Sequence, residues 1–228
     1  MATPFTTRVL LKIQKIARDL DPEEWKWRRV WPSINPIEGF LLEHQARWLF
    51  KAARSVPDGS NLVEIGSFKG RSASSLAFGC RGTKKRVFAI DSFEGNEWDF
   101  HERGFFQEFS NNIALCGLSE YVEPVVGMSS EVGKRWHKPI QLLFIDGSHR
   151  YEDVVADFEA FFGHVVPGGI IALHDVVETW PGPLRAWHEV VKPQLTRVGH
   201  CTTLAYGRKP RGNRGSVRAA VRTSGSHK

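Results

Sequence analysis

The stretch Val63-Glu64-Ile65-Gly66-Ser67-Phe68-Lys69-Gly70 decides the fold prediction. A short apolar run at 62–65 leads into two glycines spaced G-x-x-x-G, and an amphipathic segment follows. A buried strand, a glycine-containing turn and a helix are typical of the first unit of a parallel α/β sheet. Dinucleotide sites instead have G-x-G-x-x-G, whose middle glycine lets the backbone approach a pyrophosphate. The spacing therefore predicts a cofactor without phosphates.

The same alternation of short apolar runs and amphipathic segments continues along the chain. Strands are expected at 62–65, 86–90, 122–126, 142–145 and 170–173, with a closing pair at 195–198 and 202–206. Helices are expected at 70–80, 103–116, 129–136, 151–163 and 183–192. This order predicts an α/β fold with a doubly wound, mostly parallel seven-stranded sheet.

The N-terminal part is expected to form a helical cap. Apolar residues at helical spacing predict helices at 5–20 and 37–54, and the proline-punctuated segment between them is expected to be a loop or cap. The tryptophans outside the predicted core could form a lid or anchor this extension; they are Trp25, Trp27, Trp31, Trp98 and Trp180. We therefore divide the chain into a cap (1–36), a main domain (37–206) and a basic tail (207–228).

The basic charge is concentrated in that tail. The net charge is +6, and residues 207–228 hold seven Lys and Arg side chains and no acidic one, which leaves the first 206 residues at −1. The tail has almost no large apolar residues, so we expect it to be disordered and solvated, or to act as a weak anion- or RNA-binding arm. The near-neutral body argues against nucleic acid as the main partner.

Composition indicates a cytoplasmic, single-domain globular protein. The 41% hydrophobic content is ordinary, and no apolar run approaches the roughly 18 to 20 residues that cross a bilayer. The N-terminal residues lack the apolar region of a secretion signal. Three widely separated cysteines, Cys80, Cys116 and Cys201, are expected to be reduced core thiols.

Polar residues at the ends of the predicted strands indicate a ligand site, because such sheets bind ligands beyond the carboxyl ends of their strands. Asp91 ends the second run, 21 residues after Gly70. An acidic side chain at that place accepts hydrogen bonds from ribose hydroxyls. Glu64, the glycine turn and Asp91 together predict the binding of a nucleoside-containing cofactor.

With these motifs the chain resembles the class I S-adenosylmethionine-dependent methyltransferases over residues 37–206. Further matching segments are Gly127-Met128-Ser129-Ser130, Phe144 to His149, Val165-Val166-Pro167-Gly168-Gly169, in which a helix is expected to end before a strand, and His174-Asp175. The resemblance implies a Rossmann-like methyltransferase fold and S-adenosylmethionine as cofactor. The cofactor-binding residues it implies are Glu64, Gly66, Ser67, Phe68, Gly70, Asp91, Ser92, Met128, Ser129 and Asp146.

Within that family the chain is most similar to the small O-methyltransferases of the catechol and macrocin types, many of which use magnesium. The resemblance places metal ligands at Asp146, His174 and Asp175. His174 departs from the pattern, which has a carboxylate there, and imidazole suits zinc, iron or nickel better than magnesium. In the alternative without a metal, Asp175 bonds a loop or the cofactor and His174 packs at the strand end.

His149 and Asp146 are the catalytic candidates. His149 lies three residues after Asp146, where the catechol-type enzymes have a basic lysine, and imidazole can accept a hydroxyl proton near neutrality. The alternative is a histidine that caps a helix or borders the cofactor. Of the residues that follow, Tyr151 could line the pocket, and most of the acids Glu152, Asp153 and Asp157 are expected on a solvated face.

The expected activity is S-adenosylmethionine-dependent O-methylation of a small molecule such as a sugar, phenol or polyketide. Two other functions stay open: a nicotinamide oxidoreductase, and a non-catalytic module of this fold that binds RNA through the basic tail. No membrane partner is expected, and a homo-oligomer is possible through the apolar N-terminal helix.

Overall fold

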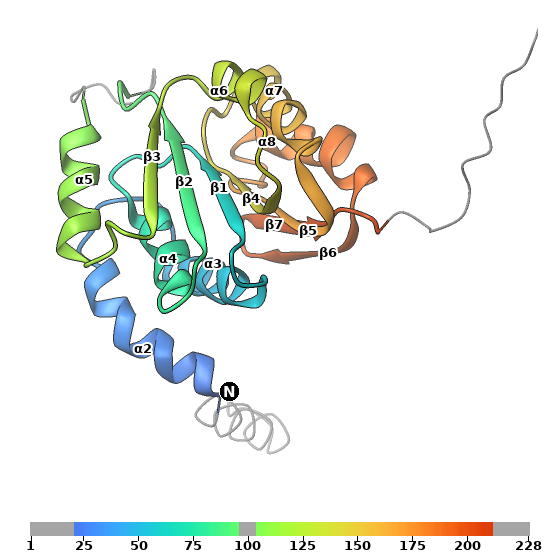
Figure 1. Ribbon diagram of the computed structural model, residues 1–228. Coiled ribbons are helices and arrows are strands. Elements are labelled where there is room, and N and C mark those ends of the chain that lie inside the picture. Colours follow the sequence, from blue (N-terminus) through green and yellow to red (C-terminus); the bar gives the residue numbers. More distant parts are fainter. Residues whose placement is uncertain (1–20, 96–103, 212–228) are drawn as a thin grey trace, which may run out of the picture.

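The computed structural model describes residues 21–95 and 104–211 (Figure 1). The expected helix at 5–20, Trp98 and the tail from residue 212 onward lie outside the described residues. No described helix is both long and apolar enough to span a bilayer.

The described strands form one seven-stranded sheet with the order β3-β2-β1-β4-β5-β7-β6. Pairing is parallel from β3 to β5, and β7 is antiparallel to both β5 and β6. The strands are β1 (Asn61–Ile65), β2 (Arg86–Asp91), β3 (Val122–Val126), β4 (Ile140–Ile145), β5 (Val165–Leu173), β6 (Thr196–Cys201) and β7 (Leu204–Arg208). The predicted doubly wound, mostly parallel sheet is confirmed.

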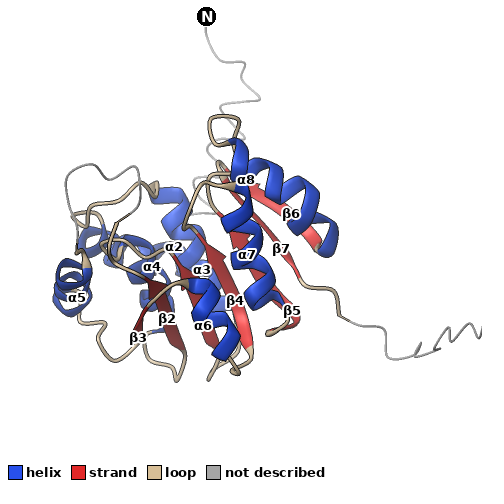
Figure 2. Cartoon of the chain, turned by 90° about the horizontal axis from the view of Figure 1, so that it is seen from above, coloured by secondary structure: helices blue, strands red, loops and turns tan. Residues whose placement is uncertain are grey.

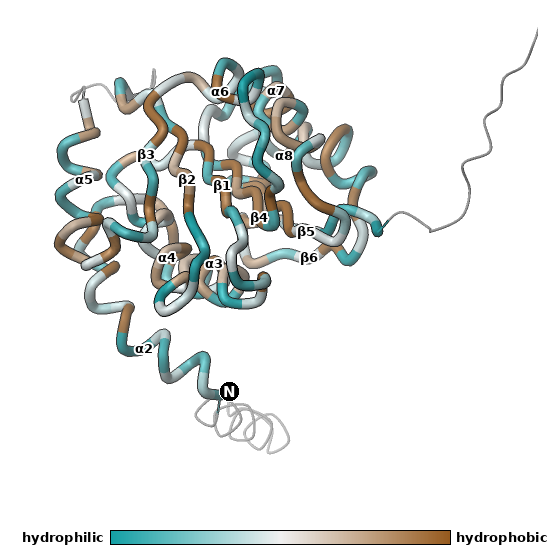
Figure 3. The backbone as a smooth tube through the Cα atoms, in the orientation of Figure 1, coloured by the Kyte–Doolittle hydropathy of each residue, from teal (hydrophilic) through white to brown (hydrophobic). Residues whose placement is uncertain are grey.

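Helices cover both faces of this sheet (Figure 2). One face carries α3 (Glu43–Ser55), α4 (Arg71–Cys80) and α5 (Phe106–Leu115). The other carries α6 (Ser129–Arg135), α7 (Tyr151–Phe162) and α8 (Pro181–Ala186), which continues into a π turn (Trp187–Val191) and a 3-10 turn (Lys192–Gln194). Side chains of the strands alternate between two buried cores, so most residues in the middle of the central strands are apolar (Figure 3).

The order of the strands places the ligand site. β1 pairs with β2 on one side and with β4 on the other, so the chain reverses its direction across the sheet between β1 and β4. Ligands of doubly wound folds bind at such a switch point, beyond the carboxyl ends of the strands. Gly66 and Asp146 are the first residues after these two strands.

The expectation of a loop in the Trp-rich segment is wrong, because Pro22–Ile34 forms helix α2. Asp21 caps it by accepting a hydrogen bond from the Glu23 amide (2.9 Å), and Pro22 occupies the first turn, where no backbone donor is needed. Pro32 falls in the last turn. Trp27 is buried against Trp31 and Phe50, with ring centroids 5.2 and 5.6 Å apart, so these tryptophans anchor α2 to the body.

Two further boundaries differ from the prediction. Helix α3 begins at Glu43 rather than at 37, because Gly39 has a φ of 156° and residues 35–42 are irregular. The segment Pro167-Gly168-Gly169 lies within β5, whereas we expected a turn that ends a helix. The β4–β5 register shifts there, since Gly168 has a left-handed φ of 82°.

Candidate functional site

The turn after β1 depends on a glycine at position 66. Gly66 has a φ of 82°, and a Cβ atom there would lie 2.2 Å from the carbonyl oxygen of Asp146. The Gly66 amide donates to the Ile90 carbonyl (2.9 Å), which fixes the turn against the end of β2. The ends of β1 and β4 therefore approach so closely that only glycine fits.

Asp91, the predicted ribose ligand, also holds this turn in place. Its Oδ2 atom accepts hydrogen bonds from the Ser67 and Phe68 amides at 2.7 and 2.9 Å. Its Oδ1 atom accepts one from the Phe93 amide at 2.8 Å. A carboxylate has about four acceptor positions, so one remains for a ligand. This role in the turn is not visible in the sequence.

Glu64 lies beneath the turn and is fully buried. Its Oε2 atom accepts a hydrogen bond from the Ser67 hydroxyl (2.7 Å), and its Oε1 atom has no partner among the described residues. The pKa of Glu64 is raised to about 8, chiefly by burial; the hydrogen bonds from Ser67 and Ser72 oppose this rise, and the nearby Asp146 and Asp91 add to it. The folded protein without a ligand therefore holds Glu64 protonated at neutral pH.

Replacing Glu64 by Gln is expected to change how stability depends on pH. Between about pH 4.5 and 8 the folded carboxyl keeps a proton that the unfolded chain releases, so stability falls as pH rises through this window. Glu64→Gln removes this dependence. The unfolding free energy of the variant minus that of wild type should therefore rise by on the order of a few kcal/mol between pH 5.5 and pH 8. Urea unfolding at both pH values measures the difference.

Glu131 is exposed, so Glu131→Gln serves as the matched control. Its difference in unfolding free energy from wild type should be the same at both pH values. If Glu64→Gln also kept a constant offset, Glu64 would be ionised in the folded protein.

A first cavity of about 400 Å³ lies beyond the ends of β1, β2 and β3. The predicted cofactor residues on its walls are Gly66, Phe68, Asp91, Ser92, Met128, Ser129 and Asp146. It is open on one side, and Met128 is 63% exposed. Asp91 and Ser129 thus lie on the walls of one recess, as a nucleoside ligand would require.

Asp157 also lines this cavity, which corrects the expectation that it lies on a solvated face. It is 6% exposed and accepts a hydrogen bond from the Ser129 hydroxyl. Burial raises its pKa to about 6, an effect that the Ser129 bond opposes. The buried positions of α7 are 154, 157, 158 and 161, a helical spacing that could have identified Asp157 from the sequence.

A second cavity of about 290 Å³ adjoins the first and shares Gly66, Phe68, Asp146 and Gly147 with it. Residues 38–41 form one wall. Lys69 fixes this wall through an ion pair with Glu38 (2.7 Å), and Arg71 Nη1 donates to the Ile37 carbonyl (2.8 Å). Sequence reasoning missed this wall, because it depends on pairs more than thirty residues apart.

His149 lines the second cavity. Its Nε2 atom is 2.9 Å from Asp175 Oδ2, and its ring stacks on Trp180 with centroids 3.9 Å apart. Its Nδ1 atom is buried and has no hydrogen-bond partner among the described residues. Asp175 orients one ring nitrogen, and the other is unpaired but enclosed.

The three predicted metal ligands, Asp146, His174 and Asp175, lie together, with ligand atoms within 4.8 Å of one another. His174 Nδ1 is 3.2 Å from Asp146 Oδ1 and 3.2 Å from Asp175 Oδ2. Burial opposes the protonation of His174, but the two carboxylates outweigh it and raise its pKa to about 10. Asp175 has a strained, left-handed φ of 55°, which is common at functional sites.

Three predicted residues do not line either cavity. Glu64 is covered by the turn, and Gly70 lies at the N-cap of α4, packed against Phe109. Tyr151 donates to Glu189 (3.0 Å) on the neighbouring helical turn instead of entering the pocket. Ser67 lines only the second cavity.

A family model described as a methyltransferase domain matches residues 63–176. This range runs from β1 to the residues just after β5, so it contains the glycine turn, Asp91, Asp146, His149 and the His174-Asp175 pair.

Three individual proteins are similar to the chain. An uncharacterised protein of Sinorhizobium fredii is 28% identical to the chain over 164 residues. The matched region is 65% of this chain but only 16% of that protein's length. CalS11, a TDP-rhamnose 3'-O-methyltransferase of calicheamicin biosynthesis, has a TM-score of 0.55 at 20% identity, covering 82% of this chain and 95% of its own. The O-methyltransferase TomG of Streptomyces achromogenes was solved with S-adenosylmethionine. It has a TM-score of 0.61 at 19% identity, and the match covers 83% of this chain and 90% of TomG.

Proposed function

Because the chain belongs to the methyltransferase-domain family, we propose that it transfers a methyl group from S-adenosylmethionine to a hydroxyl oxygen of a small molecule. The observation on which this rests is the pair of adjoining cavities at the switch point, one lined by Asp91 and the other by His149. Donor and acceptor would meet where the cavities share Gly66 and Asp146. The solved O-methyltransferases of the same fold support this assignment.

On the donor side, the first cavity would hold the nucleoside and the glycine turn would hold the amino-acid part. The remaining acceptor position of Asp91 suits a ribose hydroxyl. The positive charge of the donor would favour ionised Glu64, whose carboxyl lies beneath the turn. S-adenosylmethionine supplies a methyl group on a sulfonium, and the chain aligns it with the acceptor oxygen.

On the acceptor side, His149 would take the hydroxyl proton while the oxygen–methyl bond forms and the sulfur–methyl bond breaks. Asp175 would hold the imidazole and stabilise the resulting charge; Nδ1, which is enclosed in this structure, would receive the proton once the ring turns to expose it to the acceptor. Trp180 and Phe40 give the second cavity aromatic walls, which suit a planar or sugar-like acceptor and help exclude water.

We also propose that Asp146, His174 and Asp175 bind a divalent cation. Two carboxylates and one imidazole fit the donor set of a transition metal better than that of magnesium, which the subgroup resemblance implies. A bound cation would lower the pKa of a coordinated hydroxyl. The cation must displace the proton that His174 shares with the carboxylates, so its affinity should rise with pH.

Calorimetric titration of metal-stripped protein with S-adenosylmethionine is the first test. We expect binding in the micromolar range. A separate titration with NADH should give no change in fluorescence. A second titration with zinc, manganese or magnesium should give binding that Asp146→Ala abolishes. Absence of S-adenosylmethionine binding with and without metal would overturn the proposed function and favour a non-catalytic module.

A further inference from the structure

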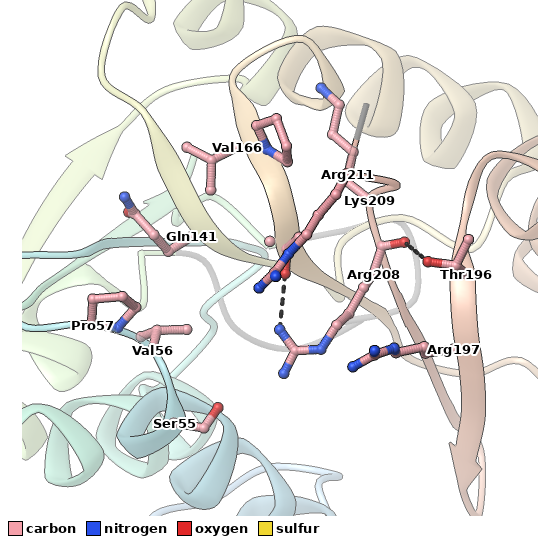
Figure 4. A pocket seen from close by; sticks show the side chains of 13 residues that line it. Ser55, Val56, Pro57, Gln141, Val166, Thr196, Arg197, Arg208, Lys209 and Arg211 are labelled. Carbon is pink, nitrogen blue, oxygen red and sulfur yellow. Dashed lines mark hydrogen bonds between the residues drawn. The ribbon is translucent and has the colours of Figure 1, made fainter. Parts of the chain in front are cut away.

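A third cavity of about 650 Å³ lies at the ends of the parallel strands that are opposite the candidate site. Figure 4 shows the residues that line it. It is formed by the residues after α3, the first residues of β4 and β5, and the outer ends of β6 and β7. These are the amino-terminal ends of the parallel strands, whereas Gly66, Asp146 and His174 follow the carboxyl ends. The two regions therefore share no residue.

The lining of this cavity is strongly basic. Four of its 13 residues are cationic and none is acidic; the cations are Arg197, Arg208, Lys209 and Arg211. Figure 4 shows the guanidinium groups of the three arginines directed toward the same space. Lys209 differs, because its amine donates to the Phe162 carbonyl at 2.8 Å. The inward charge thus comes from three arginines on β6, β7 and the segment that follows.

The sheet is distorted at Arg197, which lines this cavity. The register between β6 and β7 shifts between Thr196 and Gly199, as at a β-bulge. Arg197 adopts a left-handed φ of 52°, which costs an arginine on the order of 1 kcal/mol. Bulges often redirect a side chain toward a functional site. A glycine or asparagine would adopt this backbone at lower cost, so the residue type is not explained by the turn alone.

Two of these arginines have no partner within the chain that the structure describes. Arg208 Nη1 donates to the Gly168 carbonyl at 2.8 Å, which leaves its other donors available. The side chains of Arg197 and Arg211 make no hydrogen bond or ion pair with any described residue. Like charges gathered in a recess repel one another, and a bound anion would offset that repulsion.

We propose that this cavity binds a ligand with two or more linked phosphate groups. Guanidinium groups match phosphate oxygens with paired hydrogen bonds, and three of them could neutralise more than one phosphate. The volume is in the range of small-molecule sites and exceeds what one phosphate fills. No aromatic side chain is among the described residues that line it, so it offers no stacking surface for a base.

Such phosphates could come from a compact polyphosphate compound or from a nucleic-acid backbone. The volume of about 650 Å³ suits the compact ligand. The sequence beyond Arg211 adds Arg214, Arg218, Arg222 and Lys228 without an acidic residue, and these would favour a longer polyanion. The chemistry that Arg197 and Arg211 recognise is the same in both cases.

The test is calorimetric titration of the full chain with inorganic tripolyphosphate at low salt. The variant Arg197→Asn/Arg211→Gln removes two cations while keeping a residue that tolerates the left-handed backbone at 197. Lys84→Gln/Arg135→Gln removes two exposed cations outside the cavity and is the matched control. Thermal melts of all three proteins check that they fold.

We expect the cavity variant to lose tenfold or more of the tripolyphosphate affinity and the control to stay within twofold of wild type. Equal losses in both variants, or no saturable binding to wild type, would overturn the proposal. Displacement of tripolyphosphate by a 12-nucleotide polyuridine would identify a nucleic-acid backbone as the source of the phosphates. Failure of the oligonucleotide to displace it would identify a compact phosphorylated ligand.

Discussion

His149→Ala should keep the wild-type affinity for S-adenosylmethionine and lose turnover by a factor of about 10² to 10⁴, the usual contribution of a general base. The imidazole lies in the second cavity, bonded to Asp175 at 2.9 Å and stacked on Trp180. It does not line the first cavity, where the nucleoside would bind. Calorimetry with S-adenosylmethionine and the rate of S-adenosylhomocysteine release with hydroxylated acceptors measure the two effects separately.

Two controls separate the loss of a base from a disturbed pocket. Added imidazole should restore part of the turnover of His149→Ala, which a merely structural defect would not allow. His188→Ala removes an exposed histidine outside both cavities and should leave binding and turnover unchanged. Wild-type turnover in His149→Ala would exclude His149 from the mechanism.

The strands and the residues that follow them could be predicted because each depends on a short, local pattern. Apolar runs and glycine turns identified β1 to β5, and the rule that ligands bind beyond the carboxyl ends brought Asp91, Asp146 and His174 to one edge. The structure places Asp146, His174 and Asp175 within one cluster, as the subgroup resemblance implied. Whether the cluster binds a metal remains a prediction.

Features that depend on distant pairs could not be predicted. The wall at residues 38–41 is held by Lys69 and Arg71, and the turn at Gly66 by Asp91. Neither contact has a sequence signature, since both depend on how the chain returns to the switch point. The helix α2 was missed for another reason: its prolines occupy the first and last turns, where a helix tolerates them better than in its middle.

Gly66→Ala should have the largest effect on stability, with a loss of more than about 3 kcal/mol. A left-handed φ costs a residue with a Cβ about 1 to 2 kcal/mol. At Gly66 the Cβ would also lie 2.2 Å from the Asp146 carbonyl oxygen and 2.7 Å from Gly147 Cα, so the ends of β1 and β4 must separate. Because both cavities share these residues, S-adenosylmethionine binding should be lost even where the variant remains folded.

Gly82→Ala separates the two contributions, because Gly82 has a similar φ of 72° and nothing lies within 4 Å of the added Cβ. It should cost only the conformational part, about 1 to 2 kcal/mol, and leave cofactor binding intact. Urea unfolding and calorimetry on both variants give the comparison. Equal losses of stability would mean that the ends of β1 and β4 move apart at no cost, and the close contact between Gly66 and Asp146 would then not define the site.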